Sequence, residues 1–163
     1  MGKFREQKRA SIEAGKEKGD AAIMSGEQRV RELQAVKGMI DAAYFRDEMD
    51  REQYEALSES YERAGVEAHE REVASVVEST RVDLEQNRQD IVSERENVEN
   101  AIGRIGDMKG VTDLARSEAT NVEKNLRESV NEYQDMESLT EDIESDQEQK
   151  SQAVLNKIKS IFG

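Results

Sequence analysis

The 163-residue chain is long enough for a sizeable core, yet its 35% hydrophobic, 4% aromatic and 37% charged residues argue against an ordinary compact globule. The absence of Cys excludes a disulfide framework and a thiolate metal site, and it leaves the redox compartment open. Residues 1–19 carry six basic and three acidic side chains, and residues 150–163 carry three basic ones. Because the net charge of the chain is −13, the intervening 130 residues carry −19. This central part would repel nucleic acid.

The abundant Glu, Gln, Arg, Ala and Lys are strong helix formers, and residues that favour strands are few. Disorder is the main alternative for so charged a chain, because few apolar groups are available to offset the entropy of ordering. The periodicity of the apolar residues decides between the two and favours helices. We therefore expect an all-α protein.

Residues 1–25 are rich in Lys, Glu, Gly and Ala and show little apolar period, so they predict a flexible or weakly helical basic arm. Ser25 to Gln28 has the spacing of a capping box, which predicts a first helix over about residues 26–47. Gly38 inside this helix is expected to mark a close contact between helices. The apolar residues of the helix recur at steps of three and four: Val30, Leu33, Val36, Ile40 and Ala43.

Asp50 and Gln53 form a second capping signal, and a single Gly and no Pro follow over residues 51–102, which predicts a continuous helix there. One face of it has apolar residues at strict seven-residue spacing: Val77, Leu84, Ile91, Val98 and Ile105. The alternate column at positions 66, 73, 80, 87 and 94 is mostly polar, so the seam is thin. We expect the first helix, a second copy or a partner to complete it.

Gly103, Gly106 and Gly110 fall within eight residues and predict a hairpin turn, after which a third helix is expected over about residues 112–147. The two long helices should form an elongated antiparallel hairpin with coiled-coil-like packing. This hairpin and the first helix make up a domain over residues 26–149, which oligomerisation could complete. The seam residues of the third helix are Val122, Leu126, Val130 and Tyr133.

Residues 150–163 form a basic amphipathic segment. Either its apolar side closes the end of the bundle or fits a partner's groove, or it lies on an anionic membrane surface. We favour the first, because stable membrane anchoring usually needs two signals. No transmembrane stretch or secretory signal is recognised, so we expect a soluble protein, cytoplasmic unless it is exported without a cleaved signal. The candidate contact residues are Val154, Leu155, Lys157, Ile158, Lys159, Ile161 and Phe162.

Residues for catalysis or metal binding show no recognisable arrangement. His69 is the only histidine, and it lies in a predicted helix without a glycine-rich loop beside it, so we expect an exposed or edge histidine. Val73 breaks the His-Glu-x-x-His spacing of zinc proteases, and the carboxylates form no calcium loop. We therefore predict no enzyme activity, catalytic residue, cofactor, metal or small-molecule substrate.

Over residues 51–140 the predicted hairpin with its glycine-bearing turn resembles in shape the Trp-x-Gly family of type VII secretion substrates and their helical targeting partners, although no Trp occupies the turn. Tyr133 and Glu137 match that family's Tyr-x-x-x-acid export signal, as do Tyr44 and Glu48. The resemblance implies export without a cleaved signal.

These features lead us to expect a non-enzymatic structural or adaptor protein that acts through protein–protein contacts as a subunit of a larger assembly. Its partner is another protein or a second copy of the chain. Secretion through the type VII route and weak binding to a membrane surface are the alternatives, and no nucleic-acid partner is expected.

Overall fold

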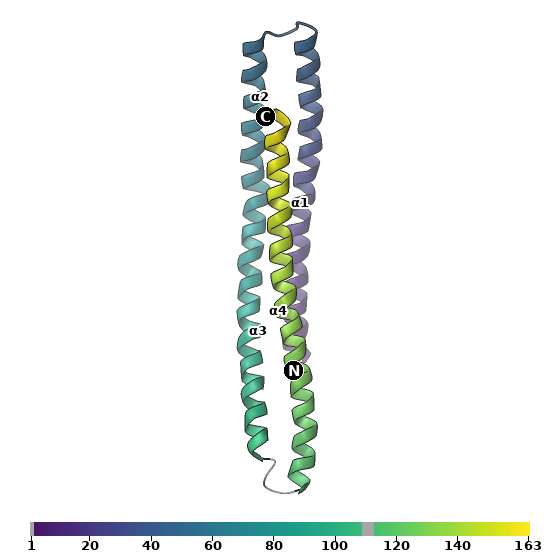
Figure 1. The fold of residues 1–163 in the computed structure, drawn as a ribbon, viewed down its shortest axis with the longest axis vertical. Coiled ribbons are helices and arrows are strands. Elements are labelled where there is room, and N and C mark those ends of the chain that lie inside the picture. The colour runs from purple at the N-terminus through teal and green to yellow at the C-terminus, as the bar shows by residue number, and fades with distance from the viewer. Residues whose placement is uncertain (1, 109–112) are drawn as a thin grey trace. The chain divides into compact units, whose positions relative to one another are not determined.

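The computed structural model describes residues 2–108 and 113–163, and its regular structure there is helical (Figure 1). The elements are α1 (Gly2–Phe45), α2 (Arg51–His69), a π-helical segment η1 (Glu70–Ala74), α3 (Ser75–Met108) and α4 (Asp113–Phe162). No strand occurs in that part of the chain, which confirms the all-α class. Within the same residues, no helix combines the length and apolar character needed to cross a lipid bilayer.

The chain divides into two compact units, and each is described by itself. Unit 1 contains Met1–Glu13 and Asp83–Ile143, so it holds the start of α1, most of α3 and the first part of α4. Unit 2 contains Ala14–Val82 and Glu144–Gly163, so it holds the rest of α1, α2, η1, the start of α3 and the end of α4. Each unit has its own cluster of buried apolar side chains.

In unit 1, α3 and α4 run in opposite directions and α1 packs beside them. Arg95 on α3 forms an ion pair with Glu137 on α4, whereas Ile102, later in α3, lines a groove with Val130, earlier in α4. The first turn of α1 reaches this pair through Phe4, whose ring meets the Tyr133 ring edge-on at 6.0 Å between centroids. The buried core consists of Ile12, Leu84, Ile91, Val98, Tyr133, Met136 and Ile143.

In unit 2, α1, α4 and the α2 to η1 region approach one another closely at two glycines. A Cβ atom at Gly26 would lie 3.0 Å from Val73 Cγ2 and 3.2 Å from Val154 Cγ1, and one at Gly65 would lie 2.8 Å from Leu33 Cδ1. The missing side chains therefore let three helices share a core with few large apolar groups. The buried apolar residues are Ile23, Val30, Leu33, Val73, Val77, Val154 and Ile158.

Of the flexible or weakly helical arm predicted over residues 1–25, the flexible alternative is wrong, because residues 2–25 belong to α1. Ile12 and Ile23 are buried, and Lys8 forms an ion pair with Asp90 of α3 at 2.6 Å. The basic charges of the segment thus lie against acidic neighbours. Its buried stripe is carried partly by glycines, which is why the sequence shows so little apolar period.

The turn between α1 and α2 is fixed by hydrogen bonds. The Glu48 N–H donates to the Ala43 carbonyl at 2.9 Å. Asp50 and Gln53 form the predicted capping box, since the Gln53 N–H donates to Asp50 Oδ1 at 2.8 Å and the Asp50 N–H donates to Gln53 Oε1 at 3.0 Å. Ser25, by contrast, lies inside α1, so no helix begins after it.

The continuous helix predicted over residues 51–102 contains a π-helical segment, η1, and a backbone hydrogen bond there joins the Ser75 N–H to the carbonyl five residues earlier. The buried residues around it follow at steps of four: Gly65, His69, Val73 and Val77. An α-helix with 3.6 residues per turn would rotate such a series away from the core. One wide turn absorbs the surplus residue and keeps the buried face continuous.

Two of the three glycines predicted for the hairpin turn lie inside a helix. Gly103 and Gly106 are exposed residues inside α3, which continues to Met108, so their assignment to the turn is wrong. A helix interior accepts each glycine at a cost of about 1 kcal/mol relative to Ala. Gly110 lies outside the described residues.

α4 is longer than the helix predicted to end near residue 147, because it continues to Phe162 and includes the C-terminal segment. Polar residues occupy part of its buried stripe, which hides the period in the sequence. The buried residues of its second half are Thr140, Ile143, Gln147, Ser151, Val154 and Ile158.

Gly38→Ala and Gly26→Ala are expected to change the free energy of unfolding in opposite directions. Gly38 does not mark the close contact expected from the sequence, since an added Cβ would meet no described atom within 4 Å. Its Ala variant should gain about 1 kcal/mol of helix propensity. At Gly26 the Cβ would press on two β-branched valines, and a net loss of about 1 kcal/mol is expected. Urea unfolding followed by circular dichroism measures both, and stabilisation of both variants would contradict the close approach at Gly26.

Candidate interaction surfaces

Most residues of the predicted packing seam lie inside their own unit. The buried ones are Val77 in unit 2 and Leu84, Ile91, Val98 and Tyr133 in unit 1. The partly buried ones are Ile105, Leu126 and Val130, all in unit 1. The α3 and α4 surfaces singled out by spacing therefore face the core at these positions.

Val122 is 47% exposed, so its assignment to the buried seam is wrong. It begins a stripe of α4 residues seven apart that includes Met136, and Met136 lines a surface pocket together with Ile12 of α1. Because α1 runs parallel to α4 in unit 1 and Phe4 already contacts Tyr133, the described residues of α1 do not extend to Val122. The stripe is covered where α1 is present and open where it is not.

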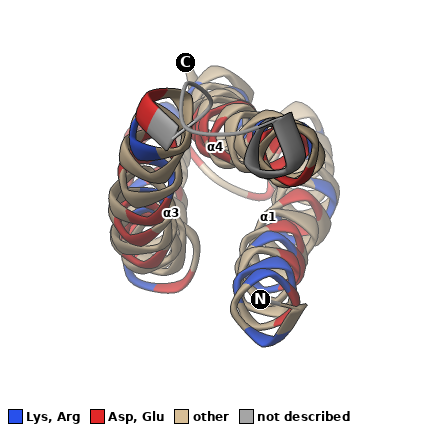
Figure 2. Ribbon diagram, turned by 90° about the horizontal axis from the view of Figure 1, so that it is seen from below, with Lys and Arg blue, Asp and Glu red and all other residues tan. Residues whose placement is uncertain are grey.

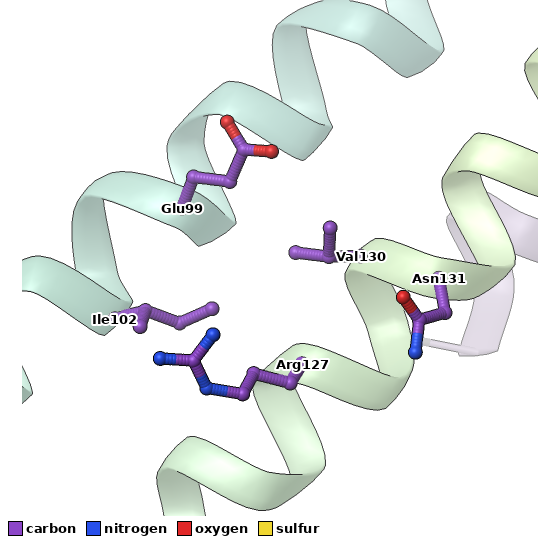
Figure 3. Close-up of a pocket in the computed structure, with 5 residues that line it drawn as sticks. All are labelled: Glu99, Ile102, Arg127, Val130 and Asn131. Carbon is purple, nitrogen blue, oxygen red and sulfur yellow. The ribbon is translucent and has the colours of Figure 1, made fainter.

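Unit 1 also contains a hollow of about 490 Å³ between α3 and α4, which we call the α3–α4 groove (Figure 3). Glu99 and Ile102 of α3 and Arg127, Val130 and Asn131 of α4 line it. Ile102 and Val130 are partly buried and pack against the unit 1 core, while Glu99 and Arg127 stand on opposite sides. The groove therefore combines an apolar base with rims of opposite charge.

A second apolar surface surrounds the α1–α2 turn in unit 2. We call it the turn surface and define it by its exposed large hydrophobic residues Met39, Tyr44, Phe45, Leu57 and Tyr61. The Phe45 side chain is 88% exposed. The turn itself includes a residue in the left-handed conformation, Asp47, with φ of 60°, which costs a non-glycine residue about 1 to 2 kcal/mol.

A polar network holds α1 against α2 beside the turn surface. Lys37 donates to Asp41 Oδ1 at 2.6 Å, and the Tyr54 hydroxyl donates to the same oxygen at 2.6 Å. The hydrogen bond between Lys37 and Asp41, assisted by Tyr54, raises the pKa of Lys37 and lowers the pKa of Asp41. Acidic and basic residues also interleave along α1 and α3 (Figure 2).

His69 is a core residue of unit 2 and not the exposed or edge histidine expected from the sequence, since only 2% of it is exposed. Its Nε2 lies 3.3 Å from Ser151 Oγ, and its Nδ1 has no hydrogen-bond partner among the described residues. Burial lowers the pKa of His69, and the carboxylate of Glu70 opposes that shift. The imidazole is therefore neutral in the folded protein at pH 7.

Other polar side chains also replace apolar ones in the two cores. In unit 1 the Asn87 amide donates to Ser11 Oγ at 2.8 Å. In unit 2 the Gln147 amide donates to the Lys16 carbonyl at 3.0 Å, and Gly19 leaves room for it, since a Cβ there would lie 2.2 Å from Gln147 Oε1. Each hydrogen bond needs one particular partner, so these residues restrict how the helices can pair.

The stability of unit 2 is expected to fall as the pH is lowered from 7.5 to 5.5. An unfolded His69, with a pKa of about 6.5, takes up a proton in this range, whereas the buried imidazole with its lowered pKa takes up less. The loss of stability is therefore at most about 1.4 kcal/mol per pH unit. The carboxylates with lowered pKa, such as Asp41, make stability depend on pH only below about pH 4.

Urea unfolding of the wild type and of His69→Leu at several pH values measures this dependence. The His69→Leu variant should show a nearly flat midpoint between pH 7.5 and 5.5. An equal slope in both proteins would assign the pH dependence to other groups.

The C-terminal segment is part of the unit 2 core. Val154 and Ile158 are buried, and Ile161 and Phe162 pack against the same cluster. Leu155 is partly buried, and the two lysines of the segment are exposed. The apolar face that could enter a membrane surface is therefore occupied by contacts within unit 2, which leaves less support for membrane binding.

The two matches to the export signal differ in accessibility. Tyr133 is buried in unit 1, and Glu137 forms an ion pair with Arg95 at 2.8 Å. Tyr44 and Glu48 are both exposed at the α1–α2 turn of unit 2. Only the second pair is presented on the folded surface.

Over the described ranges 2–108 and 113–163, no cluster of three or more His, Asp or Glu side chains is arranged to hold a metal ion. Comparisons with models of protein families, with curated proteins and with solved structures gave no match.

Proposed function

We propose that this chain is a non-enzymatic structural or adaptor protein that works through protein–protein contacts as a subunit of a larger assembly. The α3–α4 groove carries the proposal. Only 35% of the residues are hydrophobic, yet Ile102 and Val130 at the base of the groove are left without full cover in unit 1. Apolar groups that remain open beside a completed core mark a surface for a partner.

In the proposed arrangement α3 and α4 form an antiparallel hairpin with coiled-coil-like packing, and the partner supplies the helix that α1 provides elsewhere in unit 1. The spacing of the buried residues of α3 supports this, since they alternate at steps of three and four, as in coiled coils. These residues are Val77, Thr80, Leu84, Asn87 and Ile91.

A photo-crosslinking amino acid at position 131 is expected to capture a neighbouring protein in cells, and the same amino acid at position 82 is not. Asn131 lines the groove, and both Asn131 and Val82 are exposed. Mass spectrometry of the products identifies the captured chain. Equal yields at the two positions, or no product at position 131, would exclude the groove as the docking surface.

Export through a type VII route is a second candidate, and the exposure of Tyr44 and Glu48 at the α1–α2 turn favours it. Glu48→Gln should reduce the amount of the chain released by cells that have this route, because the acidic group of the accessible signal is lost. Glu137→Gln tests the buried match and should leave release unchanged. Release unaffected by either substitution, measured by immunoblot of the medium, would end this candidate.

A further inference from the structure

We propose that the occupant of the α3–α4 groove is a second copy of this chain, related to the first by a two-fold axis that runs along the groove. This rests on the proposed function, because it names the partner of the same surface. Two helix pairs joined in this way make a four-helix arrangement. Each α3 then lies beside the α4 of the other copy, at the same level along the helices.

The rims of the groove are complementary to themselves under this symmetry. Glu99 stands on α3 and Arg127 on α4, on opposite sides of the hollow (Figure 3). A two-fold interface makes each contact twice, so Glu99 of each copy faces Arg127 of the other. The base of the groove needs no such matching, because apolar contact is non-directional.

Contacts within the chain already hold the two rim side chains. Glu99 accepts a hydrogen bond from Arg95 at 3.0 Å, and Arg127 donates to Glu123 at 2.8 Å. Both are pairs along one helix, so they fix the position of each charge on its own rim. The second copy therefore meets charges whose positions are set before association, which lowers the entropy lost on binding.

The distribution of charge selects this surface for self-association. Residues 99–131 carry five basic and six acidic side chains, a net charge of −1, although the whole chain carries −13. Around the turn surface, residues 37–61 carry three basic and seven acidic side chains, a net charge of −4. Two identical chains repel least where their local charge is smallest. The α3–α4 groove therefore admits a second copy more readily than the turn surface does.

Apolar contact supplies the attraction at the base of the groove. Ile102 and Val130, which form this base, are partly buried against the unit 1 core. The second copy covers these two residues and has its own two covered in return.

Charge exchange at the rims tests the proposal. The Glu99→Arg chain has two basic rims and the Arg127→Glu chain has two acidic rims, so each should self-associate at least about tenfold more weakly than the wild type in sedimentation velocity. An equimolar mixture of the two variants restores every opposite-charge contact. It should form mixed dimers with an affinity within about threefold of the wild type.

Arg63→Glu is the matched control, because Arg63 is also exposed and also pairs with a Glu four residues earlier, Glu59, at 3.0 Å. It lies in unit 2, away from the groove, and should leave self-association unchanged. Recovery in the mixture cannot arise from a folding defect in either variant, so it is the decisive readout.

A wild-type chain that stays monomeric at every concentration, or a mixture that does not recover, overturns the second copy as the occupant. If position 131 nevertheless crosslinks to a different protein in cells, the proposed function stands with another partner. If position 131 yields no product and the wild type is monomeric, both proposals fail.

Discussion

Each core of this protein depends on three helices sharing one narrow apolar stripe, because the sequence supplies too few hydrophobic residues for a pair of helices to form a core unaided. Burial of apolar surface contributes about 25 cal/mol per Å² only where water is removed. α1 provides the third side in both units, through Ile12 in one and Ile23, Val30 and Leu33 in the other. The same requirement explains the core where α1 is present and the open groove where it is not.

Much of the fold could be predicted from the sequence where the determining interactions are local. Helix propensity, the capping box at Asp50 and the seven-residue column through Leu84 and Ile91 each depend on residues a few positions apart. The first half of α1 could not be predicted in this way, because its buried face is built partly from glycines. The contacts that hold it come from distant parts of the chain, as between Lys8 and Asp90.

The candidate surface was only half visible in the sequence. The polar positions 80, 87 and 94 show that the seam is thin and that something must complete it. Where it stays open depends on the level at which α1 meets α4, which no local pattern encodes. The rim residues Glu99 and Arg127 could not be recognised from the sequence, because 37% of all residues in the chain are charged. His69 could not be recognised as buried, because its contact with Ser151 joins residues 82 positions apart in the chain.

η1 bears on how such a chain tolerates insertions. One residue added to a regular helix turns everything beyond it by about 100°, which would bring the buried side chains of α3 to the surface. In η1 the surplus is confined to Glu70–Ala74, and the stripe from Val77 onward keeps its orientation. One helix can therefore gain a residue without a matching insertion in the helices packed against it. The lengths of the three packed helices can then diverge while the contacts between them persist.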